Sequence, residues 1–135
     1  MKLPEKTKAL FTRINTFAMA TVSSEGVPNV VPMARKYWTG DDALIIGDMF
    51  MKATRRNVLD NGKVSLCAWN DETGESYKLV GTGRYETEGE ALDLANAELA
   101  KDKPGMRFKG VVVFETLEVY DAARGRNAGA LITGG

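Results

Sequence analysis

The sequence contains no histidine and one cysteine, Cys67. Without an imidazole, the chain lacks the commonest general base and a common metal ligand, and neither a Ser-His-Asp triad nor a Cys-His pair can form. A zinc site would have to be built mainly from carboxylates, so we expect no metal centre. A single cysteine allows no intramolecular disulfide, which is typical of a reducing compartment. We therefore expect a cytoplasmic protein in which a cofactor carries any chemistry.

Long apolar runs and an excess of one charge are also missing. No segment approaches the roughly 20 apolar residues that a membrane-spanning helix needs, and the start of the chain scatters charges where a signal peptide would be apolar. The 18 Lys and Arg residues balance 18 Asp and Glu residues, so no overall field attracts nucleic acid or an anionic membrane. The length of 135 residues suits one domain with a single core.

The apolar pattern predicts about six strands and three helices. The strands are predicted at residues 17–22, 27–38, 43–46, 63–69, 76–87 and 109–120, and the helices at residues 4–15, 52–61 and 88–101. The predicted apolar face of the third helix consists of Ala91, Leu94, Ala95 and Leu99. A parallel sheet would need a helix after nearly every strand, so the pattern predicts a closed or partly closed antiparallel barrel. The tail, residues 121–135, is predicted to be irregular.

Residues 47–58, GDMFMKATRRNV, carry the strongest local signal for a ligand. They follow the predicted strand at residues 43–46 and open a helix, whose N-terminus presents unpaired backbone N–H groups and the positive end of the helix dipole. The basic and hydroxyl side chains at this helix start are Lys52, Thr54, Arg55 and Arg56. Together they predict a phosphate site. The alternative is a solvated helix face, which is the usual meaning of a charge run.

Four segments, taken in order, resemble the FMN-binding split barrel of the pyridoxamine-phosphate oxidase-like superfamily. They are FAMATVSSEGVPNVVP, ARKYW, IIGDMFMKATRRNVLDNGKVSL and VVVFETLEVYDAARGRNAG. The resemblance covers residues 10–132 and is closest to the small stand-alone FMN-binding proteins of this group. It implies a mainly β fold, a six-stranded antiparallel split β-barrel, which binds FMN non-covalently at the interface of a homodimer.

The resemblance also implies which residues hold the cofactor. The implied set is Met33, Ala34, Arg35, Lys36, Ile46, Gly47, Asp48, Lys52, Ala53, Thr54, Trp69 and Lys78. Lys36 and the helix start would bind the phosphate, and Gly47 would permit close approach of the backbone to the flavin ring. Trp69 and Lys78 would reach the flavin from the opposite subunit. The competing interpretations are that Trp69 is a buried core residue and that Arg35 and Lys36 only keep a strand edge soluble.

The function implied by the resemblance is electron transfer or a small flavin-dependent oxidation or reduction. Two alternatives are a flavin- or deazaflavin-dependent reductase of a small substrate and a non-catalytic dimeric barrel that lacks the cofactor. Oxidation of pyridoxamine phosphate is not expected, because histidine is missing and Arg124 and Arg126 lie in an unmatched context. Haem-handling relatives are not expected either, because they use a histidine ligand.

Four consecutive apolar residues, 111–114, lie in the last predicted long strand. Alternation sends half of them to each face of the sheet, so both faces must be covered. The helices at residues 4–15 and 88–101 could provide the second cover. We predict instead that a partner chain provides it, in an obligate homodimer.

Overall fold

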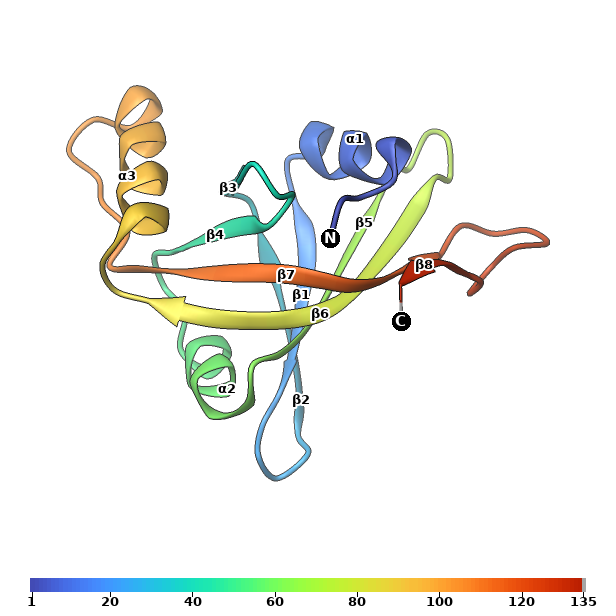
Figure 1. Cartoon of the computed structure of the whole chain (residues 1–135), viewed down its shortest axis with the longest axis horizontal. Coiled ribbons are helices and arrows are strands. Elements are labelled where there is room, and N and C mark those ends of the chain that lie inside the picture. The colour runs from blue at the N-terminus through green and yellow to red at the C-terminus, as the bar shows by residue number, and fades with distance from the viewer. Residues whose placement is uncertain (135) are drawn as a thin grey trace.

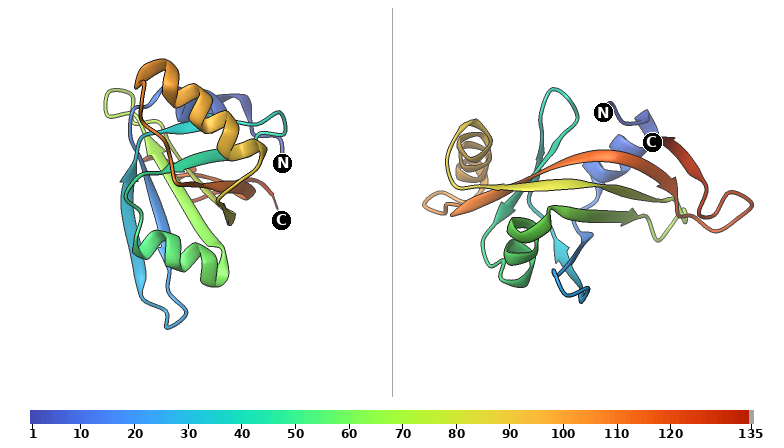
Figure 2. Two further views of the ribbon diagram at one scale, coloured as in Figure 1. Left: turned by 90° about the vertical axis from the view of Figure 1, so that its left-hand side faces the viewer. Right: turned by 60° about the horizontal axis from the view of Figure 1, so that its bottom comes forward.

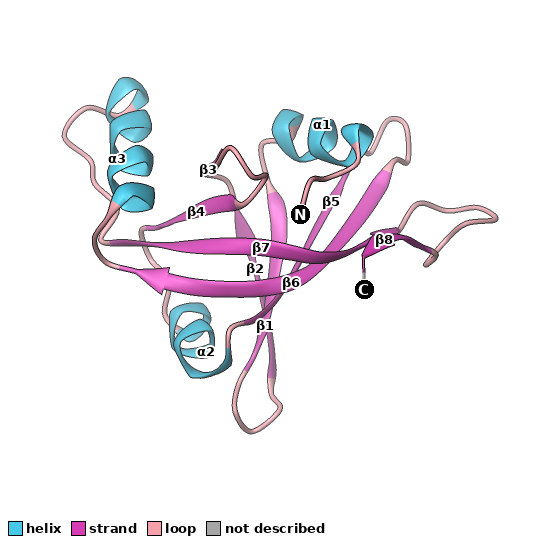
Figure 3. Cartoon of the chain, viewed as in Figure 1, coloured by secondary structure: helices cyan, strands magenta, loops and turns pink. Residues whose placement is uncertain are grey.

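The structure, a computed structural model that describes residues 1–134, is mainly β (Figure 1, Figure 3). Its helices are α1 (Glu5–Arg13), α2 (Ala53–Asn61) and α3 (Glu90–Asp102). Its strands are β1 (Phe17–Val22), β2 (Pro28–Met33), β3 (Lys36–Trp38), β4 (Leu44–Asp48), β5 (Lys63–Trp69), β6 (Ser76–Glu86), β7 (Gly110–Asp121) and β8 (Leu131–Gly134). Among the described residues, no helix is long and apolar enough to cross a membrane.

The strands form one curled antiparallel sheet in the order β2-β1-β5-β6-β7-β4-β3, and β8 pairs with β7. The terminal strands of this order, β2 and β3, do not pair with each other, so the barrel is split between them. The prediction of an antiparallel split barrel is confirmed. Figure 2 shows the helices at separate places around the sheet, with α2 beside the β1–β2 hairpin.

The number of strands differs from the prediction at two places. Residues 27–38 form two strands, because the chain leaves β1 after Met33 and pairs with β4 from Lys36 onward. At this break the Gly47 N–H donates to the Arg35 carbonyl over 3.2 Å. The tail is not wholly irregular, since β8 continues the sheet along the edge of β7. Both differences arise from pairing with the strand next in sequence, of β3 with β4 and of β8 with β7.

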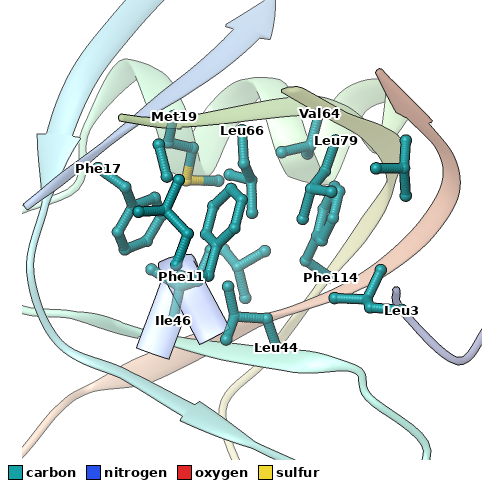
Figure 4. Close-up of a cluster of buried hydrophobic side chains, with 14 of the residues drawn as sticks. Leu3, Phe11, Phe17, Met19, Leu44, Ile46, Val64, Leu66, Leu79 and Phe114 are labelled. Atoms are coloured by element: carbon teal, nitrogen blue, oxygen red, sulfur yellow. The ribbon is translucent and has the colours of Figure 1, made fainter. Parts of the chain in front are cut away.

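The main core fills the inside of the curled sheet (Figure 4). Strand β1 shows how the sequence builds it, because Phe17 and Met19 point inward and are fully buried while Ala18 between them is half-buried. Helix α1 closes one end of the barrel with Leu10 and Phe11. The rings of Phe11 and Phe17 meet edge to face at 6.1 Å.

A second apolar cluster lies on the other face of β7, beneath α3. Val111 and Val113 pack there with three residues of the helix, Leu92, Ala95 and Leu99. All four residues 111–114 are therefore buried within one chain, and the prediction that a partner covers them was wrong. The predicted helix face was also partly wrong, since Leu94 is 38% exposed and Leu92 is buried in its place. The stripe 92, 95 and 99 satisfies helical spacing equally well, and the position of α3 over the sheet selects it.

Candidate functional site

The split in the barrel contains a cavity of about 480 Å³. This volume lies in the range of roughly 300–1,000 Å³ that is typical of small-molecule sites. Its walls are the β2 strand with the break that follows it, the loop between β4 and α2, the start of α2, and Phe108. The cavity therefore lies where segments far apart in the sequence meet.

One part of the cavity is apolar. Its lining side chains are Val31, Met33, Met49, Met51 and Phe108. The Phe108 ring lies directly on Gly47, where an added Cβ would fall 2.3 Å from a ring carbon. Gly47 therefore permits the close approach of the Phe108 ring, and the approach of a flavin ring to its backbone stays a prediction.

Phe108 is held in place by polar contacts that the sequence did not reveal. Its N–H donates to Asn96 Oδ1 over 2.7 Å, and its carbonyl accepts from Asn96 Nδ2 over 3.4 Å. Its ring packs edge to face against Tyr37 at 6.4 Å between centroids. No periodicity in residues 103–109 marks Phe108 as a cavity residue, because its position depends on α3.

The other part of the cavity is polar and cationic. Lys52 is the N-cap residue of α2, and within the described chain no side chain caps this helix. The backbone N–H groups of its first turn are thus free to bind an anion. The Thr54 hydroxyl is buried and accepts from Asn29 Nδ2 over 3.0 Å, which leaves its proton to donate. These groups suit a phosphate.

The edge of β2 adds backbone groups to the cavity wall. Strand β2 is the terminal strand of the sheet and pairs only with β1. Its other edge, along Val31 and Met33, borders the cavity. Unpaired N–H and C=O groups along such an edge can hydrogen-bond to the rim of a heteroaromatic ring.

The structure brings several of the predicted site residues together at this cavity. They are Met33, Ala34, Arg35, Gly47, Lys52, Ala53 and Thr54. Arg35 also forms an ion pair with Asp102 at the end of α3. Among the described residues that line the cavity, the ionisable side chains are those of Arg35 and Lys52, and both are cationic.

Other predicted residues lie outside the cavity. Lys36 Nζ donates to the Ile14 carbonyl over 2.8 Å, and partial burial lowers the pKa of Lys36. Ile46 belongs to the main core. The Asp48 carboxylate is buried and binds donors of its own chain, as described below.

The two residues expected to act from a partner subunit also lie away from the cavity of their own chain. Trp69, at the end of β5, is 45% exposed. The Lys78 ammonium lies 4.5 Å from the centre of the Tyr120 ring. Contact of either residue with a flavin therefore requires a second copy of the chain and stays a prediction.

Tyr85 lies beside the site, where its hydroxyl donates a hydrogen bond to Asp48. Burial and this hydrogen bond favour the neutral phenol and raise the pKa of Tyr85 to about 12, while the charge of Arg55 acts in the opposite direction. A pKa above the usual 10 means that the Tyr85 contribution to stability is complete below pH 10 and is lost as the pH rises to about 12. We expect the difference in the free energy of unfolding between the native protein and Tyr85→Phe to shrink over this range. Urea denaturation at several pH values measures it. A difference that is constant from pH 9 to pH 12 would contradict the assignment.

Comparison with known proteins identifies relatives of this chain. Residues 3–122 match the sequence profile of the family described as Pyridoxamine 5'-phosphate oxidase. The chain is 39% identical over 116 residues to an uncharacterized protein of Methanocaldococcus jannaschii, covering 84% of this chain and 77% of that protein. HupZ of Group A Streptococcus has a similar structure, with a TM-score of 0.81 and 27% identity over 95% of this chain and 100% of the other.

Solved structures of lower sequence identity share the fold. An FMN-binding protein from Syntrophomonas wolfei has a TM-score of 0.77 and 19% identity, covering 90% of this chain and 87% of its own. The haem storage protein HutZ of Vibrio cholerae has a TM-score of 0.70 and 16% identity, with coverages of 91% and 97%. An F420 reductase has a TM-score of 0.66 and 19% identity, with coverages of 87% and 98%. The fold is thus used for several different ligands.

Proposed function

This chain belongs to the pyridoxamine 5'-phosphate oxidase family, and from that premise we propose that it binds FMN non-covalently and acts in electron transfer or as a small flavin-dependent oxidoreductase. The observation that carries the proposal is the shape and chemistry of the cavity in the split. Its cationic part at Lys52 and Thr54 suits the FMN phosphate, and its apolar part suits the flavin ring.

FMN supplies the redox chemistry when it is bound. The chain's own residues would bind and orient it. Lys52, the Thr54 hydroxyl and the first amides of α2 hold the phosphate, while the edge of β2 meets the ring. Met33, Met49 and Phe108 exclude water from one side of the ring. Such a pre-formed apolar wall lowers the cost of ordering the cofactor.

Two other cofactors are known from proteins of this fold. Deazaflavin also carries a phosphate and a tricyclic ring, so it is the second candidate, and the structural similarity to an F420 reductase favours it. Haem is disfavoured because the chain contains no histidine to ligate the iron.

We also propose a homodimer with FMN at the subunit interface. The support is the sheet face that points away from the core, where the side chains are small or apolar. They are Ala18, Ala20, Val30, Pro32, Ser65 and Cys67. Val30 in this face is 66% exposed, and Pro32 also lines the cavity. A second sheet packed here would bury the face and extend one wall of the site.

The purified protein is expected to carry a chromophore whose mass and absorbance are those of FMN, in a particle of two chains. Absorbance spectroscopy, mass spectrometry of the released ligand and sedimentation velocity measure this. A bound deazaflavin would select the second candidate, and bound haem or failure to bind added FMN would reject the proposal. A flavin-loaded monomer at micromolar concentration would reject the two-chain site. Consumption of NADH or NADPH distinguishes a reductase from an electron carrier.

A further inference from the structure

Asp48 lies at the end of β4, where the chain leaves the sheet and turns toward α2. Its side chain is fully buried. One carboxylate oxygen, Oδ1, accepts from the Met51 N–H over 2.8 Å, and the other, Oδ2, accepts from the Tyr85 hydroxyl. Both oxygens are therefore directed at groups of the same chain.

The loop that Asp48 holds forms a large part of the cavity. Residues 49–51 all line the cavity, and Lys52 follows them as the N-cap of α2. The hydrogen bond to Met51 spans the loop and fixes its end to the end of β4. The position of Lys52 and of the first α2 amides relative to the sheet therefore depends on this bond.

The Tyr85 side chain is in turn positioned by the sheet. Tyr85 lies on β6, and its hydroxyl approaches Gly110, where an added Cβ would fall 2.4 Å from the oxygen. Gly110 is the register partner of Asp48 in the β4–β7 pair. The absence of a side chain at residue 110 lets the Tyr85 hydroxyl reach across β7, which lies between β6 and β4, to the Asp48 carboxylate.

We propose that Asp48 is a positioning residue that sets the phosphate end of the cavity through the Met51 N–H, and does not itself contact the cofactor. This role rests on the proposed binding of FMN. It replaces the expectation from the family resemblance that Asp48 is one of the residues that hold the cofactor. A charge-assisted hydrogen bond to a buried carboxylate is among the stronger polar contacts in proteins, so its loss should free the loop.

The test compares Asp48→Ala with Asp48→Asn, which retains an oxygen acceptor for the Met51 N–H. If the loop of residues 49–51 in Asp48→Ala adopts the arrangement that binds FMN only about a tenth of the time, the FMN affinity of this variant falls about tenfold. The asparagine variant should bind within about threefold of the native protein. Val119→Ala, a core substitution on β7, controls for a loss of stability alone and should leave the affinity unchanged. An alanine variant with native affinity, or an asparagine variant as weak as alanine, would overturn the proposal.

Amide hydrogen exchange gives a second measurement that needs no bound cofactor. In the unmodified protein the Met51 amide donates to Asp48, whereas the Phe50 amide has no backbone acceptor among residues 1–134. The Met51 amide should therefore exchange with solvent more slowly than the Phe50 amide. The alanine variant should lose this protection and the asparagine variant should keep it. Equal exchange at residues 50 and 51 of the unmodified protein would overturn the positioning role. The comparison of residues 50 and 51 in the unmodified protein tests the hydrogen bond to Asp48 even if FMN does not bind, and it needs no variant.

Discussion

Lys52→Ala and Thr54→Ala are each expected to weaken FMN binding about ten- to a hundredfold while leaving the barrel folded. Each substitution removes one hydrogen bond to the phosphate, and Lys52→Ala also removes a positive charge. The expected loss of affinity corresponds to roughly 1.5–3 kcal/mol of binding free energy. The exposed Lys52 side chain has no structural partner in the described chain, so its loss should not affect stability. Quenching of FMN fluorescence on titration with apoprotein measures the affinity.

Two matched variants separate a specific effect from a general one. Lys6→Ala removes an exposed positive charge on α1, outside the cavity and the proposed dimer face, and should bind FMN like the native protein. Thr54→Ser keeps the hydroxyl and should retain most of the affinity. The Thr54 hydroxyl also accepts from Asn29, so circular dichroism should accompany each titration. Native affinity in both alanine variants would place the phosphate elsewhere.

Phe114→Ala is expected to lower the free energy of unfolding by about 3–5 kcal/mol, the usual cost of removing a buried phenyl ring. Phe114 is 1% exposed and belongs to the main core of the curled sheet. Its ring lies beside Gly81, where an added Cβ would fall 2.9 Å from the ring. Because the ring fills the space above a glycine, the neighbouring backbone has little freedom to collapse into the cavity that alanine would leave.

Urea denaturation followed by circular dichroism measures this change. Leu117 lies on the same strand but is 53% exposed, so Leu117→Ala should change the free energy of unfolding by no more than about 0.5 kcal/mol. Similar effects of the two substitutions would contradict the core assignment. The native protein should be compared with its variants at one protein concentration, since dimerisation would add to the measured stability.

The sequence predicted those features that depend on neighbouring residues. Strand β5 and the end of α2 at Asn61 follow from local apolar alternation and from Gly62, which adopts the left-handed conformation with φ of 67°. The positions of Lys52 and Thr54 at a helix start follow from the succession of strand, short loop and helix. The break between β2 and β3 was not predicted, because residues 27–38 are extended on both sides of it and only the pairing in the folded sheet, of β2 with β1 and of β3 with β4, separates the two halves.

By itself, the sequence determined the antiparallel barrel class and the cationic helix start, because both are set by patterns within a few residues. Only the tertiary structure decided what surrounds that start. Asn29 reaches Thr54 from 25 residues away, and Asn96 fixes Phe108 from another element. Lys36 and Asp48 were predicted to face a ligand, but bonds to Ile14, Met51 and Tyr85 direct their polar groups into their own chain. A buried polar group must find a partner, and the identity of that partner depends on long-range packing that no local pattern records.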